Sequence, residues 1–386
     1  MSTDFQAYND GGLPTEGFER LTETFTKHLD QSQGGMAFCV YREGKPLVRF
    51  YGGSTTRRDS PDAEVTDPWT PETMAVMFSG TKGLVATVAA ILVDQGKLDV
   101  RRRVADYWPE FAAAGKQDVT VSQLLNHTIG LVYVDPEPEG EWAQLDNAAN
   151  AAVLAAQEPL WEPGSKVAYH AITYGYLMNE LFARITGKSA GQLIRELIAE
   201  PLGLDIHLGL PEELEDRVAT IFRSDNYAIS TYLTDPERRK IVDRMYGSTL
   251  MGEKLRTNEP EMHRGELAAG GGIATADAMA NLYSQLAAGK LVSPETLADA
   301  TQTWSVGTDA INDRPLRFGV GFELADPIGT YGPVEGAFGH SGAGGGLHGT
   351  WPTHNIGFSY LINEMLAENQ DTRIKDLLAV VSMSVS

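Results

Sequence analysis

Hydrophobic positions recur with helical spacing in some parts of the chain and in short, strand-like runs in others. Between residues 14 and 29 apolar side chains return at every third or fourth position, which predicts an amphipathic helix. Residues 36–40 and 47–51 are two short apolar runs joined by a polar turn, and they predict a β-hairpin. Residues 1–13 are polar with paired glycines, so we expect a loose tail there.

The most apolar stretch is residues 84–93, which is apolar on nearly every side of a helix. It is too long for a typical strand, is rich in alanine and leucine, and is followed by Gly96. We therefore predict a buried helix that ends at this glycine. Ser79 and Lys82 precede the run and lie three residues apart, so a helix that begins here places them on one face.

The rest of the chain contains further helical and strand-like patterns. Helices are expected at 98–111, 121–125, 143–157, 172–185, 211–218, 235–246, 279–286 and 371–383. Strands are expected at 318–324, 337–339, 346–351 and 356–363.

Strands at both ends of the chain with helices between them predict an α+β protein. We expect an α/β sandwich, in which helices flank an antiparallel sheet, with an inserted all-helical domain. Residues 1–78 and 276–386 are assigned to the sandwich domain and residues 79–275 to the mainly helical domain. The charge-rich segment 205–265 is interpreted as a lid or insertion.

Composition and charge restrict the classes of partner. The chain has 386 residues, a net charge of -21 and one cysteine, Cys39, which lies in an apolar run and is interpreted as a core thiol. An acidic protein does not suit nucleic acid or anionic membranes, both of which need clusters of lysine and arginine. The first residues carry no basic-then-apolar signal region, and no window reaches the ~18 apolar residues of a membrane span. These features favour a cytoplasmic protein.

Ser79 and Lys82 form the strongest candidate for chemistry. A serine is a poor nucleophile unless a base lies beside it, and a lysine acts as that base only when its pKa is lowered. Burial and the positive end of a helix dipole both lower the pKa of a lysine. The alternative is structural: Ser79 caps the helix, and Lys82 extends its amine to solvent.

A second candidate is the glycine-rich stretch 338–346, which follows a strand-like run. Glycines allow a substrate to approach the backbone closely, and backbone N–H groups there would stabilise an oxyanion. The stretch lacks the Gly-Lys-Ser/Thr ending of a P-loop, the helix that follows a dinucleotide-binding turn, and the spacing of a G-x-S-x-G elbow. His340, His348 and His354 have no H-E-x-x-H motif or carboxylate cluster with them, so we expect no metal site.

Taken together, these motifs resemble the serine β-lactamase and penicillin-binding-protein superfamily, in particular its class C branch. The resemblance rests on Ser79-x-x-Lys82, on Tyr169 about ninety residues later, and on His340-Ser341-Gly342 near the end of the chain. Supporting stretches in the same order are residues 125–131, 161–164, 169–175 and 318–322. The resemblance covers residues 35–365 and implies a β-lactamase/transpeptidase-like fold.

The resemblance also implies a role for each matching residue. Ser79 is the nucleophile that accepts the acyl group, and Lys82 helps to deprotonate it. Tyr169 moves the proton, as the base in acylation and the acid toward the leaving group. The backbone N–H groups of Ser79 and Ala343 form the oxyanion hole. His340 takes the place of the lysine in the family's K-T-G motif.

Substrate-binding contacts are expected from Ser341 and Gly342, beside the oxyanion hole. No cofactor or metal is implied. The expected partner is a small-molecule ester, with no nucleic acid and no membrane, and the oligomeric state is left open by the sequence.

Two departures from the class C pattern direct the functional expectation. Position 171 is alanine where the family has the asparagine of Tyr-x-Asn, and His340 replaces the lysine that helps to bind a β-lactam carboxylate. The closest resemblance is therefore to family VIII carboxylesterases, which implies hydrolysis of esters with short acyl chains. The alternatives are an amidase, a D-aminopeptidase or a β-lactamase with the same site, and an inactive ligand-binding homologue.

Overall fold

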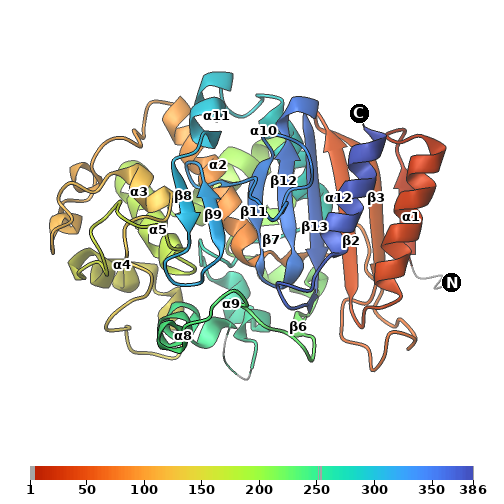
Figure 1. Ribbon diagram of the computed structural model, residues 1–386, viewed down its shortest axis with the longest axis horizontal. Helices are drawn as coiled ribbons and strands as arrows, with labels where there is room; N and C mark the ends of the chain where they lie inside the picture. Colours follow the sequence, from red (N-terminus) through yellow and green to blue (C-terminus); the bar gives the residue numbers. More distant parts are fainter. Residues whose placement is uncertain (1–4, 251, 253, 386) are drawn as a thin grey trace.

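One antiparallel sheet forms the centre of the computed structural model, which describes residues 5–250, 252 and 254–385 (Figure 1). Within those residues the sheet has nine strands, and it takes three from the start of the chain and six from the last third. In spatial order they are β1 (Phe5–Asn9), β3 (Lys45–Gly53), β2 (Gly35–Arg42), β13 (Ile356–Ile362), β12 (Leu347–Trp351), β11 (Phe338–Ser341), β10 (Glu323–Leu324), β9 (Pro315–Phe318) and β8 (Ser305–Thr308). The α+β class is confirmed.

The N-terminal hairpin is confirmed, and the expectation of a loose tail ahead of it is wrong for residues 5–9. Strand β1 pairs with β3 at the edge of the sheet, and Phe5 and Ala7 pack against the core. Its intervening residues are polar or exposed, so five residues offer too few apolar positions for the pattern to stand out. Residues 1–4 lie outside the described part of the chain.

Helices cover both faces of the sheet. Helices α1 (Thr15–Leu29) and α12 (Arg373–Ser384) pack together on one face, where Phe25 of α1 lies 5.2 Å from Phe50 of β3 between ring centroids. Helix α10 (Ala276–Ala287) covers the other face, beside β2, β12 and β13. Cys39 points to that second face and is completely buried, so the interpretation as a core thiol is confirmed.

The helix expected at 84–93 is α2 (Thr81–Asp94), and it lies in the middle of the molecule (Figure 1). Every residue from Thr81 to Leu92 is buried, because the helix runs between the sheet and the helical region. Gly96 follows with a φ of 68°, a left-handed conformation that suits glycine and ends the helix. A 3-10 turn, η1 (Phe78–Gly80), leads directly into the helix.

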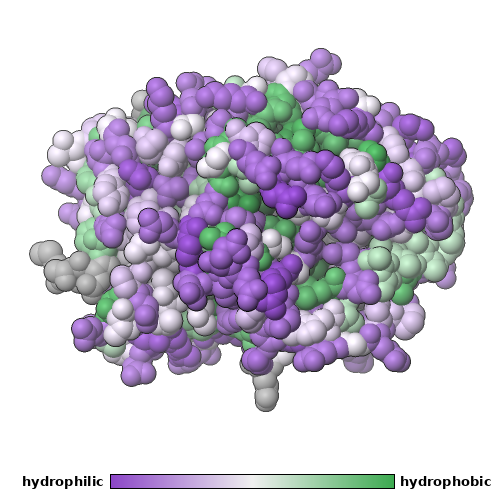
Figure 2. Space-filling view, turned by 180° about the vertical axis from the view of Figure 1, so that it is seen from behind, coloured by the Kyte–Doolittle hydropathy of each residue, from purple (hydrophilic) through white to green (hydrophobic). Residues whose placement is uncertain are grey.

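The remaining helices are α3 (Val121–Leu125), α4 (Asn147–Ala156), α5 (Thr173–Thr186), α6 (Ala190–Ile194), α7 (Glu200–Leu202), α8 (Pro236–Leu250), α9 (Pro260–Arg264) and α11 (Pro294–Thr301). Of these, α6 and α11 pack against α2. Short strands pair β4 (Ala75–Val76) and β5 (Ile206–His207) with β7 (Ile273–Ala274), and β6 (Phe222–Arg223) with β14 (Glu364–Met365). Seen from behind, the surface is mainly hydrophilic and shows apolar side chains only in small groups (Figure 2).

Several expected elements are shorter than the sequence patterns suggested. Residues 98–111 contain only 3-10 turns, as do residues 211–218, and the helix expected at 143–157 begins only at Asn147. The strand expected at 318–324 is split into β9 and β10. The split occurs at Gly321, whose φ of 80° is incompatible with a continuous strand.

Candidate active site

Ser79 lies in the η1 turn at the N-terminal end of α2 and is partly exposed. The residue before it, Phe78, has a φ of 48°, which is strained for a side chain of this size. The residue after it has to be glycine, because a Cβ on Gly80 would lie 2.5 Å from the ring of His348. This tight turn holds the Ser79 hydroxyl at the surface of a cavity, while its neighbours are buried.

Lys82 is completely buried in the first turn of α2, so the alternative in which its amine extends to solvent is wrong. Its Nζ lies 2.8 Å from the carbonyl oxygen of Ala171, 2.8 Å from that of Ala269 and 3.2 Å from Ser79 Oγ. Burial lowers the pKa of this amine well below its usual value, against the opposing charge of Glu323. A neutral amine has two N–H bonds and one lone pair. When the N–H bonds point to the two carbonyls, the lone pair faces Ser79.

Tyr169 lies on an extended segment just before α5. A backbone hydrogen bond and the packing of its ring hold it there. Its N–H donates to Asp309 Oδ2 at 3.1 Å, and its ring lies nearly parallel to Phe318 at 6.3 Å between centroids. Lys82 Nζ lies 4.9 Å from the centroid of the Tyr169 ring. Burial raises the pKa of the Tyr169 phenol, and a hydrogen bond with Ser79 only partly offsets that rise, so the phenol stays protonated at neutral pH.

Strand β11 ends beside Ser79 and brings the glycine-rich stretch to it. A Cβ on Gly342 would lie 2.4 Å from the carbonyl oxygen of Met77, so only glycine allows this approach. Among the described residues, neither the Ser79 N–H nor the Ala343 N–H donates to another protein group. Two backbone donors without partners at one cavity fit the expected oxyanion hole.

His340 is buried on β11, and its ring lies 6.1 Å from that of Tyr169 between centroids. Its Nδ1 contacts the carbonyl oxygen of Ser341 at 2.9 Å, so Nδ1 carries the proton, and the Nε2 lone pair has no partner in the described chain. Burial lowers the pKa of His340 to about 4, even though Glu323 opposes this shift. His340 is therefore uncharged at neutral pH.

Glu323 on β10 was not identified from the sequence. Its carboxylate accepts hydrogen bonds from Ser341 Oγ at 2.7 Å, from the Ser341 N–H at 3.0 Å and from Tyr331 at 2.8 Å, and it pairs with Arg314 at 2.9 Å. Burial raises its pKa, but Arg314, His340 and these donors outweigh burial and lower the pKa to about 2. The available signal was an acidic residue directly after the motif 318–322, within a buried strand pattern.

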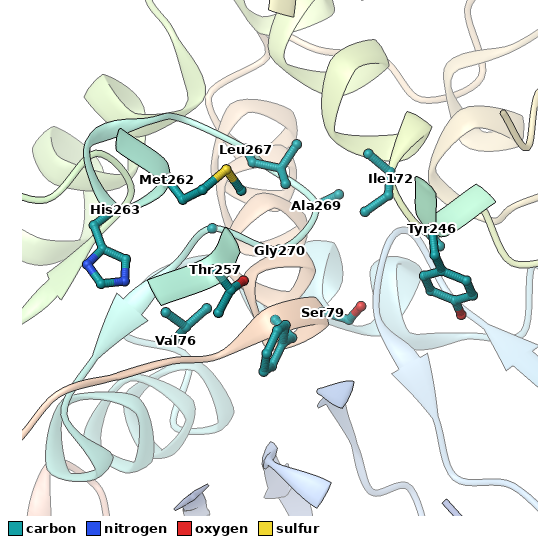
Figure 3. Close-up of a pocket in the computed structure, with 13 residues that line it drawn as sticks. Val76, Ser79, Ile172, Tyr246, Thr257, Met262, His263, Leu267, Ala269 and Gly270 are labelled. Carbon is teal, nitrogen blue, oxygen red and sulfur yellow. The ribbon is translucent and has the colours of Figure 1, made fainter. Parts of the chain in front are cut away.

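Two cavities meet at Ser79. The larger has a volume of about 190 Å³ and is lined by Tyr169, His340, Ser341, Gly342 and Ala343 as well as Ser79. The predicted site residues other than the buried Lys82 thus share one cavity. The smaller has a volume of about 20 Å³ and lies on another side of Ser79, with mainly apolar walls (Figure 3). Its walls include Val76, Phe78, Ile172, Met262 and Leu267.

No group of three histidine, cysteine or acidic side chains arranged to hold a metal occurs among the residues that the structure describes. None of the helices in that same part of the chain has the length and apolar character needed to cross a membrane.

Comparison with known proteins gives the family. The sequence model of the Beta-lactamase family matches residues 18–381. The chain is 34% identical to "Esterase/beta-lactamase LipL" of Mycobacterium tuberculosis over 86% of this chain and 78% of that protein. Among solved structures, it is similar to a penicillin-binding-protein homologue from Caulobacter crescentus, with a TM-score of 0.84, 33% identity and coverage of 99% and 100%. A family VIII carboxylesterase matches with a TM-score of 0.84, 31% identity and coverage of 98% and 99%. The chain therefore belongs to the Beta-lactamase family, and its β-lactamase/transpeptidase-like fold is the fold that the motifs implied.

Proposed function

We propose that this protein hydrolyses carboxylic esters with short acyl groups through an acyl-enzyme on Ser79. The observation that carries this proposal is the buried Lys82 amine, whose Nζ lies 3.2 Å from Ser79 Oγ and 2.8 Å from each of two carbonyl oxygens. An amine that is neutral at working pH and faces a serine hydroxyl activates that serine as a nucleophile. The names of the relatives, an esterase/beta-lactamase and a carboxylesterase, agree with this chemistry.

In the first half of the reaction Ser79 Oγ forms a bond to the ester carbonyl carbon and gives its proton to Lys82. The resulting oxyanion accepts from the N–H groups of Ser79 and Ala343. When the bond from carbon to the alcohol oxygen breaks, Tyr169 donates its proton to the alkoxide and regains one from Lys82. Tyr169 suits the role of acid because its raised pKa keeps the phenol protonated. For the same reason we assign the base in acylation to Lys82, whose pKa is lowered, and not to Tyr169 as the resemblance implied. Water then attacks the acyl carbonyl carbon and gives one proton to Lys82. When the bond from that carbon to Ser79 Oγ breaks, the Lys82–Tyr169 pair returns this proton to Ser79, and the carboxylic acid is released.

The two cavities suggest where each half of the substrate binds. The cavity of about 20 Å³ has room for about one water-sized group, which fits the methyl of an acetyl group. The cavity of about 190 Å³ is large enough for the alcohol half. We therefore assign the acyl group to the smaller cavity and the alcohol to the larger one.

Charge in the larger cavity favours an ester over a β-lactam. A β-lactam carries a carboxylate, and the family binds it with the lysine that His340 replaces here. The cavity wall carries more acidic than basic side chains. These are Asp309, Glu323, Glu368 and Asp371 against Arg314 and Lys375. An anionic group in this cavity would be repelled, whereas a neutral alcohol would not.

A matched pair of substrates tests this proposal. Methyl 4-acetoxybenzoate and 4-acetoxybenzoate share the scissile acetyl ester and differ in one negative charge on the leaving group. We expect kcat/KM for the anion to be lower by about tenfold, with the difference shrinking at high salt because salt screens charge. A chromogenic cephalosporin and a D-amino-acid amide complete the panel. Turnover of either one orders of magnitude faster than both esters would contradict the proposed function.

Replacing Tyr169 with phenylalanine tests the assignment of the acid. We expect kcat for ethyl acetate to fall by roughly 10²- to 10³-fold, because the leaving alkoxide loses its proton donor. The decrease for p-nitrophenyl acetate should be smaller, because p-nitrophenolate leaves without a proton. Tyr174→Phe is the matched control: Tyr174 is also near Lys82, with its ring centroid 5.8 Å from Nζ, but its hydroxyl has no partner among the described residues. Similar kcat values for the two variants would remove Tyr169 from the mechanism.

A further inference from the structure

A third cavity lies behind the small cavity at Ser79. It has a volume of about 300 Å³, and its only wall residues in common with the small cavity are Ile172 and Tyr246. Its other walls are largely polar. They include Glu137, Glu141, Gln144, Asn150, Arg244 and Arg256. Ile172 and Tyr246 thus form a partition between a small apolar cavity and a larger polar one.

Tyr246 also lines the cavity of about 190 Å³ to which we assign the alcohol. It is the one residue shared by all three cavities in the part of the chain that the structure describes. In Figure 3 the Tyr246 ring and Ile172 stand on one side of Ser79, and Val76, Met262 and His263 stand on the other. The ring therefore bounds the space next to the nucleophile.

Packing holds the Tyr246 ring in place. The ring packs against two separate hydrophobic clusters, one around Phe78 and Val76 and the other around Ala171 and Met245. Helix α8 changes direction immediately after it, at Gly247, where φ is 48° and ψ is -142°. A side chain at position 247 would be strained in that conformation, so the bend that follows Tyr246 suits glycine.

We infer that Tyr246, together with Ile172, sets the length of acyl group that the enzyme accepts. This inference rests on the proposed function. With the ring present, an acyl chain longer than about two or three carbons meets the partition, so short esters are the substrates. With the ring removed, the small cavity joins the polar cavity, and a longer chain extends from Ser79 into it.

The test compares Tyr246→Ala with Tyr246→Phe, which keeps the ring and removes only the hydroxyl. The readout is the ratio of kcat/KM for p-nitrophenyl hexanoate to that for p-nitrophenyl acetate. We expect the ratio to rise by about 10- to 100-fold in Tyr246→Ala, the range that methylene-sized changes in a pocket produce, and by less than about threefold in Tyr246→Phe. Ile172→Ala, which opens the same partition, provides a second variant if Tyr246→Ala does not fold.

A polar analogue shows whether the chain enters the polar cavity. The 6-hydroxyhexanoate ester should gain more than the hexanoate ester in Tyr246→Ala, because the hydroxyl finds polar partners there. An equal or smaller gain for the hydroxylated ester would indicate general loosening of the site and would overturn the inference. An unchanged hexanoate-to-acetate ratio in folded Tyr246→Ala and Ile172→Ala would overturn it as well.

Labelling of Ser79 separates this inference from the proposed function, because it requires no ester turnover. The probes are fluorophosphonates that carry a methyl or a hexyl chain on phosphorus. Faster labelling of Tyr246→Ala than of the wild type by the hexyl probe supports the partition even if no ester is hydrolysed. Ester hydrolysis by the wild type with no change in either chain-length ratio would leave the proposed function intact and refute the partition.

Discussion

Replacing Ser79 with alanine is expected to lower kcat for p-nitrophenyl acetate by roughly 10⁴-fold or more. The reason is that the acyl group would have no oxygen to which it could bond. Lys82 and the backbone N–H groups would remain. However, Lys82 would have no hydroxyl to deprotonate, and the N–H groups would have no oxyanion to stabilise. The loss should appear in kcat and kcat/KM alike, because the missing bond forms only during the reaction.

Mass spectrometry after treatment with a fluorophosphonate checks the same residue directly. We expect one adduct, on the peptide that contains Ser79, and none in Ser79→Ala. Ser341 is the informative control, because it is the other serine that the resemblance places in the site. Its hydroxyl donates to Glu323 at 2.7 Å, and that carboxylate is a very weak base because its pKa is lowered to about 2, so Ser341→Ala should still be labelled at Ser79. A folded wild-type protein that gains no adduct would support the inactive, ligand-binding alternative.

The second large effect is expected at Lys82. In Lys82→Met the side chain keeps much of its length but offers no lone pair to the Ser79 proton, and we expect kcat to fall by about 10³-fold. The wild-type rate should decrease as the pH falls through the lowered pKa of Lys82, because protonation removes the base. The rate should not fall on the alkaline side until Tyr169 ionises, well above its usual range. A profile of log kcat/KM against pH measures both limbs.

Two further variants distinguish a base from a buried cation. Lys82→Arg keeps a donor but not a base, because a guanidinium stays protonated, so it should be as inactive as Lys82→Met. Lys116→Met is the matched control, because Lys116 is also fully buried and donates to the carbonyls of Ala113 and Gln157, away from Ser79. It should retain the rate and the pH profile. An active Lys82→Arg variant would mean that position 82 needs only a positive charge.

The amino-acid sequence predicted the fold well where the hydrophobic period was long and regular. Residues 84–92 are buried on all sides, and residues 36–51 form a hairpin, because in each case local periodicity and tertiary burial favour the same structure. The pattern was misleading at residues 5–9 and 98–111. A five-residue edge strand is stabilised by its neighbour in the sheet, and helix-forming composition does not yield a helix where the chain must turn repeatedly.

In the candidate site, too, the sequence predicted some residues and missed others. Ser79, Tyr169 and His340 were identified from motifs, because each motif sets residue types at a fixed spacing. Glu323 and Tyr246 were missed, because their importance lies in what surrounds them. Glu323 accepts hydrogen bonds from Ser341 on β11 and pairs with Arg314. Tyr246 lines all three cavities.

The sequence by itself determined the residue types of the chemistry, the family resemblance, and a hydroxyl and an amine three residues apart at the start of a buried helix. Only the tertiary structure decided the protonation state and the orientation of that amine. The burial of Lys82 lowers its pKa, and the carbonyls of Ala171 and Ala269, 89 and 187 residues away in the sequence, orient its lone pair. Local sequence cannot specify such a state, because a pKa depends on the solvent excluded and the charges brought near by the whole fold.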